Sequence, residues 1–471
     1  IYDKWTEPTY PVLRLNFLNF DKNSLEKFNN KLNSKITEFA ELNHVTSYKE
    51  KEEAEDSIDH LLEQLRLENR QIVILIDEYD CQMTANINNE TLYKQFQEKI
   101  KSFYATIKNK WPIKFLGITG VTRLKDVEIF SIGSDIRDIT NASAYSQMIG
   151  FTRDEIKRYY IDYLKLAASS ENKCRVEEVT DTQIESMLDM MAQNYDGYCF
   201  DEFYKKKVFS TWSVNKFFQS VVSNKFVYFG EYWYDNGGLP SILVNYLKTH
   251  ELNIFEYLDK DKFLKVSSDD FKNPTALTTI NQNVLMCQTG YLTLRSDLNK
   301  TSTVALGIPN GEIYKALNRL LANNIFKGNT DITDDYGRSL LEVGTVDDII
   351  NLFNSALNSV SYDNYPIVSE SSVQNMLKLY LLGAHQKVLS EVHEAKGRAD
   401  LVVNTDNRRI VFEFKYAKNE TEAKSKLLDA VEQIKTRDYG NIVPKKTELL
   451  RIAAVFNADP KVRAFTEYQS V

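Results

Sequence analysis

Apolar runs in the first part of the chain predict three β-strands separated by helices. Residues 11–17 (PVLRLNF) alternate apolar and polar side chains, which is typical of a strand. Residues 72–76 (IVILI) and 114–120 (KFLGITG) are apolar runs, which suit strands covered on both faces of a parallel sheet. Helical stretches fill the intervals at 23–42, 48–68 and 90–110. This order predicts a doubly wound α/β sheet.

The centre of the chain shows helical rather than strand periodicity. Residues 151–245 carry apolar side chains at helical spacing. Thr152 and Glu155 stand three residues apart, which is the capping-box pattern that opens a helix. We therefore expect an α/β core at 1–150, followed by a helical region at 151–306.

Two segments are predicted for the remainder of the chain. Helices expected near 311–324 and 345–361 suggest that residues 307–364 form a helical connector. Residues 365–471 are then expected to form a second α/β domain, because helix and strand patterns alternate there. Its expected elements are a helix at 370–383, a strand at 388–394, strands at 399–403 and 410–414 around a turn at 404–408, a helix at 421–436 and a last strand at 449–455.

Three charged side chains interrupt the apolar strands of the predicted hairpin. Asp400 opens the first strand, and Glu413 and Lys415 lie two residues apart in the second, so these two point to the same face. Charges at such positions are costly unless they are paired or bind a cation. Two carboxylates make an oxygen-rich site of the kind that Mg²⁺ uses, and a nearby lysine can stabilise charge on a scissile phosphate. The alternative is a salt-bridged hairpin on a solvated face.

The spacing of these residues resembles the signature of a nuclease superfamily. Asp400, twelve further residues and then Glu413-x-Lys415 is similar to the pattern of the PD-(D/E)XK nucleases. The dipeptide Gly397-Arg398 directly before the aspartate matches the GRxD form of that fold. The resemblance implies a restriction-endonuclease-like α/β domain that hydrolyses phosphodiester bonds of nucleic acid.

The same resemblance implies a role for each site residue. The two hairpin carboxylates would bind Mg²⁺ or Mn²⁺, with Glu370 at the start of the upstream helix as an extra acidic ligand. Lys415 would position or deprotonate the attacking water. Related nucleases place a Gln and a Tyr on and after the next helix, and the matching Gln433 and Tyr439 would contact phosphate or orient the lysine.

The second predicted strand ends in acidic residues. Asp77 and Glu78 follow the apolar run 72–76, and this pattern resembles a Walker B motif, in which Asp holds Mg²⁺ and Glu polarises water. An ordinary acidic turn after a strand is the alternative. Arg123 follows the third strand, where it is either a sensor-like residue or a structural arginine at a strand end.

Longer stretches resemble a family of AAA-ATPase-like proteins that commonly carry a C-terminal PD-(D/E)XK domain. The matching stretches are TGVTRLKDVEIFS at 119–131, DIT at 138–140, YDGYCF at 195–200, YWYDNGGLPSIL at 232–243, QTGYLTL at 288–294 and IPNGEI at 308–313. The resemblance implies an AAA-like doubly wound parallel-sheet domain with a helical lid, in front of the nuclease-like domain.

The nucleotide-binding loop of that family has no counterpart in the sequence. ATP hydrolysis needs a Gly-rich loop ending in Gly-Lys-Ser/Thr, whose backbone amides and lysine hold the phosphates. Its place would be before the strand at 11–17, upstream of Ile1. We expect the chain to be either a piece of a longer ATPase or an ATPase relic. ATP is therefore expected as a cofactor only if an upstream loop exists.

Composition limits the other function classes. The chain has 471 residues, 43% of them hydrophobic, which supports substantial cores, and its net charge of −8 argues against a globally basic nucleic-acid coat. The four cysteines form no C-x-x-C pair and the five histidines no H-E-x-x-H motif, so neither a zinc centre nor a disulfide framework is expected. No apolar run approaches ~18–20 residues, so we expect no membrane span.

Nucleic acid is the partner that the nuclease resemblance implies, with DNA favoured over RNA. Two alternatives stay open: an ATP-driven switch with a nuclease-like effector tail, and a non-catalytic nuclease-fold module that binds a protein inhibitor or antidote in a toxin or effector system. The presence of all three hairpin charges favours the nuclease, because a binding module has no need of them. We expect a bacterial cytoplasmic protein, with secretion into a host as the effector alternative.

Overall fold

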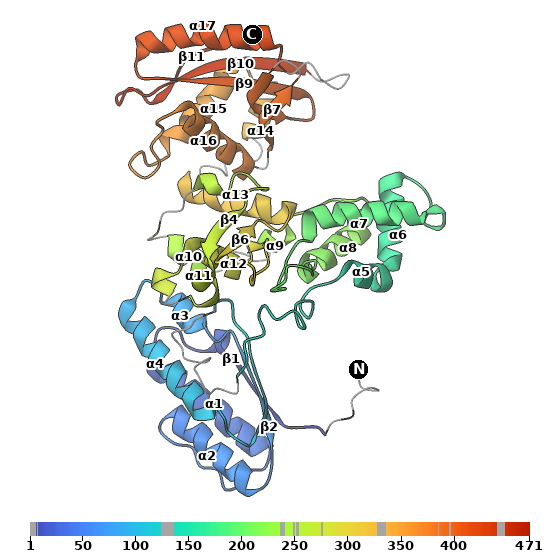
Figure 1. Ribbon diagram of the computed structural model, residues 1–471, viewed down its shortest axis with the longest axis vertical. Helices are drawn as coiled ribbons and strands as arrows, with labels where there is room; N and C mark the ends of the chain where they lie inside the picture. Colours follow the sequence, from blue (N-terminus) through green and yellow to red (C-terminus); the bar gives the residue numbers. More distant parts are fainter. Residues whose placement is uncertain are drawn as a thin grey trace. The chain divides into compact units, whose positions relative to one another are not determined.

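The computed structural model of the protein divides into two compact units (Figure 1). The first unit comprises Ile1–Val227, Gly237–His250 and Phe263–Pro309, and the second comprises Tyr228–Asn236, Glu251–Lys262 and Asn310–Val471. The structure describes residues 6, 8–123, 136–235, 241–247, 250, 254–274, 277–326, 336–384, 386–394, 397–439 and 448–471. Parts of the predicted stretches 119–131 and 232–243 lie outside the described residues.

A parallel sheet forms the core of the N-terminal part of the first unit. Its strands are β1 (Val12–Asn16), β2 (Ile72–Asp77) and β3 (Ile113–Ile118), hydrogen-bonded in the order β1-β2-β3. The connecting helices are α1 (Leu25–Leu42), α2 (Ala54–Leu67), the short α3 (Cys81–Ala85) and α4 (Glu90–Ile107), drawn in blue in Figure 1. The prediction of a doubly wound α/β sheet is confirmed for these residues.

A buried carboxylate joins the loops that follow β2 and β3. Asp80 is 1% exposed, and its carboxylate accepts hydrogen bonds from the backbone N–H of Thr122 at 2.6 Å and of Val121 at 3.2 Å. The Tyr79 hydroxyl donates to the Thr122 carbonyl oxygen at 2.6 Å. Burial raises the pKa of Asp80, although these hydrogen bonds act against the rise. The carboxyl ends of two neighbouring strands are therefore held together by the side chains of Asp80 and Tyr79.

Replacing Asp80 with alanine is expected to destabilise the first unit. The buried N–H of Thr122 and the part-buried N–H of Val121 would lose their acceptor, which costs about 2–3 kcal/mol. The change is measured as a lower urea midpoint for unfolding of the full chain. Asp80→Asn keeps one carbonyl acceptor and should lose less, so an alanine variant as stable as wild type would contradict the role given to this carboxylate.

The rest of the first unit is helical at first and then contains a small sheet. Its helices of seven residues or more are α5 (Arg153–Tyr159), α6 (Ile161–Asn172), α7 (Asp181–Tyr195), α8 (Thr211–Asn224), α10 (Ser241–Leu247) and α12 (Gln282–Gln288). The predicted capping box is confirmed, because Thr152 Oγ accepts from Glu155 N at 3.2 Å and Thr152 N donates to Glu155 Oε2 at 2.8 Å.

A three-stranded antiparallel sheet lies within the region that the sequence predicted to be helical. It consists of β4 (Leu264–Ser267), β5 (Thr293–Leu294) and β6 (Thr303–Gly307), in the order β4-β6-β5. These strands are two to five residues long, which is too short for a strand period to stand out in the sequence. The prediction of a helical region at 151–306 therefore omitted this sheet.

The second unit is built on a five-stranded mixed sheet and the helices before and within it. The helices are α9 (Tyr232–Asp235), α13 (Gly311–Ile325), α14 (Tyr336–Val343), α15 (Val346–Asn358), α16 (Glu370–Gly383) and α17 (Glu420–Arg437). The strands are β7 (Lys387–Glu394), β8 (Gly397–Asn404), β9 (Arg408–Ala417), β10 (Glu448–Asn457) and β11 (Ala464–Ser470). The sheet order is β11-β10-β9-β8-β7, and only the β9–β10 pair is parallel.

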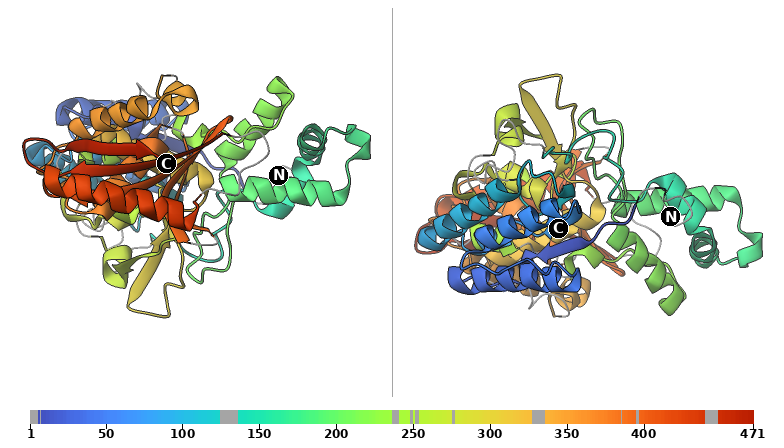
Figure 2. Two further views of the ribbon diagram at one scale, coloured as in Figure 1. Left: turned by 90° about the horizontal axis from the view of Figure 1, so that it is seen from above. Right: turned by 90° about the horizontal axis from the view of Figure 1, so that it is seen from below.

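Helices cover both faces of this mixed sheet. On one face, α17 contributes Ala430 and Ile434 to a buried cluster that includes Val411 of β9. On the other face, Phe353 of α15 packs against Phe412, with ring centroids 5.4 Å apart. Figure 1 shows α17 on the side of the sheet opposite α15 and α16, and the view from above in Figure 2 shows the orange-red α17 lying along the strands. The predicted α/β class of this domain is confirmed.

The structure contains a C-terminal strand that the sequence analysis did not predict. The sequence predicted a last strand at 449–455, which corresponds to β10, but β11 follows it and pairs with it in antiparallel fashion.

Within the described part of the chain, none of the helices has both the length and the apolar character required to cross a bilayer.

Candidate active site

The three charged residues of the hairpin converge where β8 and β9 separate. Pairing of the two strands runs from Asn404 opposite Arg409 to Leu401 opposite Phe412. One further step in this register places Asp400 opposite Glu413, and directly opposed side chains in an antiparallel pair are neighbours. The predicted hairpin and its charged end are therefore present in the fold.

Asp400 replaces the missing strand pairing with a side-chain hydrogen bond. Its Oδ2 accepts from the backbone N–H of Phe414 at 2.8 Å, and the residue is 9% exposed. Burial raises the pKa of Asp400 to about 6, whereas hydrogen bonds from Phe414 and the Gln374 side chain and the charge of Lys415 oppose the rise. The carboxylate is thus fixed in position, and its charged form is disfavoured by its surroundings.

Glu413 is the most deeply buried charged group of the site. It is fully buried, and its Oε1 accepts a hydrogen bond from Lys415 Nζ at 2.8 Å. Its Oε2 is buried and has no hydrogen-bond partner. Burial, followed by the charge of Asp400, raises the pKa of Glu413 to about 7. A buried carboxylate oxygen without a partner is costly, so this group requires a ligand or a proton.

Lys415 links the hairpin to helix α16. Its Nζ lies 2.8 Å from Glu413 Oε1 and 3.3 Å from Glu370 Oε1. Burial alone would lower the pKa of Lys415, but the hydrogen bond to Glu413 and the neighbouring carboxylates outweigh it, so the pKa is raised. Helix α16 begins at Glu370, as predicted, with Ser369 as N-cap. The lysine is therefore a stable cation between two carboxylates.

The donor set fits a magnesium-type cation that relies on few protein ligands. Among the residues that the structure describes, no three His, Cys, Asp or Glu side chains are grouped closely enough to hold a metal ion by themselves. Glu370 lies against Lys415 instead of completing such a group. Mg²⁺ is commonly held by one or two carboxylates together with water and substrate phosphates, and the unpartnered Oε2 of Glu413 beside Asp400 offers such a position.

Gln433 and Tyr439 meet at the end of helix α17, but the tyrosine is not accessible. Tyr439 is fully buried, and its hydroxyl accepts from Gln433 Nε2 at 3.4 Å and from an Arg437 guanidinium nitrogen at 2.8 Å. The tyrosine therefore positions other side chains and is not exposed to a phosphate. The hydrogen bond that Arg437 donates to the Tyr439 hydroxyl is the largest cause that raises the pKa of Arg437, and the charges of Glu413 and Asp400 raise it further.

Arg437 is the cation that sequence reasoning missed. It lies four residues after Gln433 on α17, so both side chains project from the same helix face. That spacing was the signal that could have identified it. An arginine held near two carboxylates is suited to binding a phosphate group that arrives there.

Replacing Tyr439 with phenylalanine is expected to loosen Arg437 without unfolding the domain. The ring would still fill its buried position, whereas Arg437 would lose its acceptor, so we expect KM to rise about fivefold and kcat to change less. Steady-state cleavage of an oligonucleotide measures both constants. Gln433→Leu removes the weaker contact at 3.4 Å and serves as a comparison. A fall in kcat with unchanged KM would contradict the positioning of a substrate-binding arginine.

The Walker B-like residues lie at the carboxyl edge of the parallel sheet. Asp77 ends β2, and its carboxylate accepts from the Thr119 hydroxyl at 2.5 Å and from Asn16 Nδ2 at 3.3 Å. Glu78 has a left-handed backbone with φ of 55°, and burial, followed by the charges of Asp80 and Asp77, raises its pKa. The Arg123 side chain pairs with Asp138 at 2.6 Å, which favours the structural alternative for this arginine.

Comparisons with known proteins agree with this two-part organisation. Residues 2–130 match the family model described as "Predicted AAA-ATPase", and residues 368–465 match the model described as "PD-(D/E)XK nuclease superfamily". A protein of Azotobacter chroococcum mcd 1, named "Uncharacterized protein in vnfD 5'region", is 22% identical over 400 residues, which cover 83% of this chain and 70% of that protein. No solved structure matches the chain. The chain is therefore similar to predicted AAA-ATPases over residues 2–130 and to the PD-(D/E)XK nuclease superfamily over residues 368–465.

Proposed function

We propose that the C-terminal domain hydrolyses phosphodiester bonds of nucleic acid with the help of a divalent metal ion. The observation that carries this proposal is the buried Oε2 of Glu413, which has no partner although Asp400 and Lys415 stand beside it. A purely structural salt bridge gives no reason to leave one buried oxygen unsatisfied. A cation-binding site does give such a reason, because the oxygen is then kept available for the ion.

Asp400 and Glu413 would hold Mg²⁺ or Mn²⁺, and the bound ion would supply positive charge to the scissile phosphate and lower the pKa of a water. The hydrogen bond from Phe414 N keeps the Asp400 carboxylate oriented. Because the pKa of Lys415 is raised, we assign it the role of a cation that orients the water and stabilises developing charge. Removal of a proton from the water by this lysine is the less favoured of its two predicted roles.

Arg437 would bind a non-bridging oxygen of the substrate phosphate. Its guanidinium is held by the Tyr439 hydroxyl and lies within the electrostatic reach of Glu413 and Asp400. Gln433, from the same helix face, would support that placement. These contacts support a substrate that carries phosphodiester groups, with DNA favoured over RNA as the first to be tested.

The experiment is incubation of the purified full chain with plasmid, single-stranded DNA and RNA of matched sequence. Each substrate is tested with Mg²⁺, with Mn²⁺ and with EDTA. We expect cleavage of a nucleic acid that requires a divalent ion. Asp406→Asn is a matched control, because it removes an exposed carboxylate from the turn of the same hairpin, away from the site. Lack of cleavage of all three substrates by wild-type protein with either metal would overturn the proposal.

A further inference from the structure

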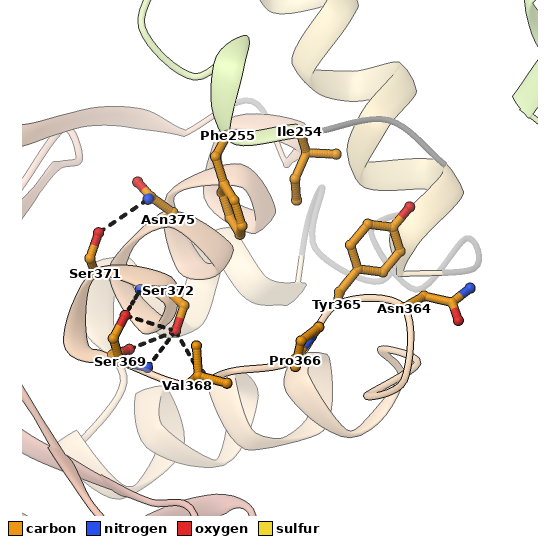
Figure 3. Close-up of a pocket in the computed structure, with 10 residues that line it drawn as sticks. All are labelled: Ile254, Phe255, Asn364, Tyr365, Pro366, Val368, Ser369, Ser371, Ser372 and Asn375. Carbon is orange, nitrogen blue, oxygen red and sulfur yellow. Dashed lines mark hydrogen bonds between the residues drawn. The ribbon is translucent and has the colours of Figure 1, made fainter. Parts of the chain in front are cut away.

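A cavity in the second unit lies next to the site residues on helix α16. Its volume is about 480 Å³, which is in the range of pockets that bind small organic groups. Figure 3 shows Ile254 and Phe255 on one wall and Tyr365 on another, with Ser371, Ser372 and Asn375 of α16 beside them. We call this cavity the α16 pocket. All of its lining residues belong to the same compact unit.

The lining of the α16 pocket suits a flat, uncharged ligand. None of its ten described lining residues carries a charge, so these residues offer no cation for a phosphate and no anion for an amine. Phe255, which is 36% exposed, and Tyr365 supply aromatic surface. Hydroxyl and amide groups of Ser371 and Asn375 supply hydrogen-bond donors and acceptors, and the two side chains contact each other at 3.5 Å. Aromatic faces combined with neutral polar groups are what proteins use to bind unstacked nucleobases.

The position of the pocket relative to the hydrolytic residues follows from the helix itself. Glu370 lies between the pocket residues Ser369 and Ser371, and its carboxylate contacts Lys415 at 3.3 Å. Gln374, one turn later, hydrogen-bonds to Asp400. Residues one position apart on a helix project about 100° from each other, so one face of α16 serves the hydrolytic site and the adjacent face lines the pocket.

We propose that the α16 pocket binds the unstacked base of a nucleotide next to the scissile phosphate in single-stranded nucleic acid. The proposal rests on the proposed nuclease function and names its substrate class. A base in a duplex is stacked and paired, so a pocket of this kind favours a single strand or a frayed end over an intact duplex. Phe255 provides the stacking surface, and Ser371 and Asn375 contact the edge of the base.

The test combines base removal with removal of the aromatic wall. Single-stranded oligonucleotides with one abasic site at successive positions around the cut are compared with the intact strand. We expect one abasic position to raise KM about tenfold for wild-type protein. Phe255→Ala should raise KM on the intact strand by a similar factor and should show no further rise on that abasic strand. If the effects of the abasic site and of Phe255→Ala on KM multiply, or if the variant has no effect, the proposal is overturned.

Two further variants guard against misfolding and unspecific effects. Ser371→Phe introduces a large side chain at an exposed helix position and should fill the pocket, giving the same loss as Phe255→Ala. Phe263→Ala removes a 60% exposed phenylalanine from the other compact unit and should have no effect. Equal losses from Phe263→Ala and Phe255→Ala would overturn the assignment of the pocket.

A binding measurement separates this inference from the hydrolytic proposal. In EDTA, an oligonucleotide carrying 2-aminopurine is titrated with wild-type protein and with Phe255→Ala. We expect fluorescence quenching by stacking with wild type and little with the variant. Quenching in EDTA without cleavage when a divalent metal is added would overturn the hydrolytic proposal and support base binding in the α16 pocket. Cleavage with equal quenching by both proteins would overturn base binding in the pocket alone.

Discussion

Replacement of Asp400 by asparagine is expected to lower the rate of nucleic-acid cleavage by about 10²–10³-fold or more. The asparagine side chain still offers a carbonyl oxygen to Phe414 N, so the hydrogen bond at 2.8 Å that positions β8 against β9 can persist. What disappears is one of the two negative charges that we propose to bind the cation. The measurement is single-turnover cleavage of the preferred substrate at saturating Mg²⁺.

The alanine variant at the same position separates chemistry from folding. Asp400→Ala removes the acceptor for Phe414 N, but it also removes a charge that raises the pKa of Glu413 by repulsion. We therefore expect a folded protein with no detectable cleavage, and an unfolding midpoint close to that of wild type measured in EDTA. Asp406→Asn, on the exposed turn of the hairpin, should cleave normally. Cleavage at the wild-type rate by Asp400→Asn would contradict the assignment of Asp400 to the active site.

The hairpin and its helix could be predicted because their signals are local. Helix α16 runs from Glu370 to Gly383 as expected, since an N-cap serine precedes a regular apolar stripe. Strands β8 and β9 are strongly apolar runs on either side of a polar turn, so their pairing follows from the sequence. Strand geometry placed Glu413 and Lys415 on one face, and the nuclease resemblance added Asp400 to the same site.

Elements with weak local signals escaped prediction. Strand β11 has the sequence AFTEYQS, in which only Phe465 is buried, because the strand lies at the edge of the sheet. The strands of the small sheet in the first unit are too short to show a period. Both depend on tertiary pairing rather than on their own hydrophobic pattern.

The finer features of the site depend on three-dimensional contacts. Nothing in the sequence indicates that Tyr439 is buried and binds Arg437, because the contact forms only when the chain turns after α17. The unpartnered oxygen of Glu413 likewise appears only once β9 is enclosed between its neighbours. The roles expected for Asp400, Glu413 and Lys415 came from the nuclease resemblance, whereas the burial of Tyr439 and its contact with Arg437 were not predictable.

Glu413→Gln is expected to stabilise the metal-free protein at pH 8. The folded-state pKa of Glu413 is raised from 4.5 to about 7, so the fold favours the protonated form. The contribution of Glu413 to the free energy of unfolding is therefore largest below about pH 4.5, and it is lost as the pH rises through 7. The ionised glutamate should cost about 2–3 kcal/mol at pH 8, which glutamine avoids while still accepting a hydrogen bond from Lys415.

Thermal unfolding of the full chain in EDTA at pH 5 and pH 8 measures this effect. We expect Glu413→Gln to unfold at a higher temperature than wild type at pH 8, with most of the difference gone at pH 5. Mg²⁺ at pH 8 should stabilise wild type but not the variant, because only the ionised glutamate can bind the cation. Glu422→Gln is the matched control, since the hydrogen bond from Lys426 lowers the pKa of Glu422 and its replacement should bring no gain. If Glu413→Gln unfolds at or below the wild-type temperature at pH 8, the buried oxygen is not the costly group that the metal site requires.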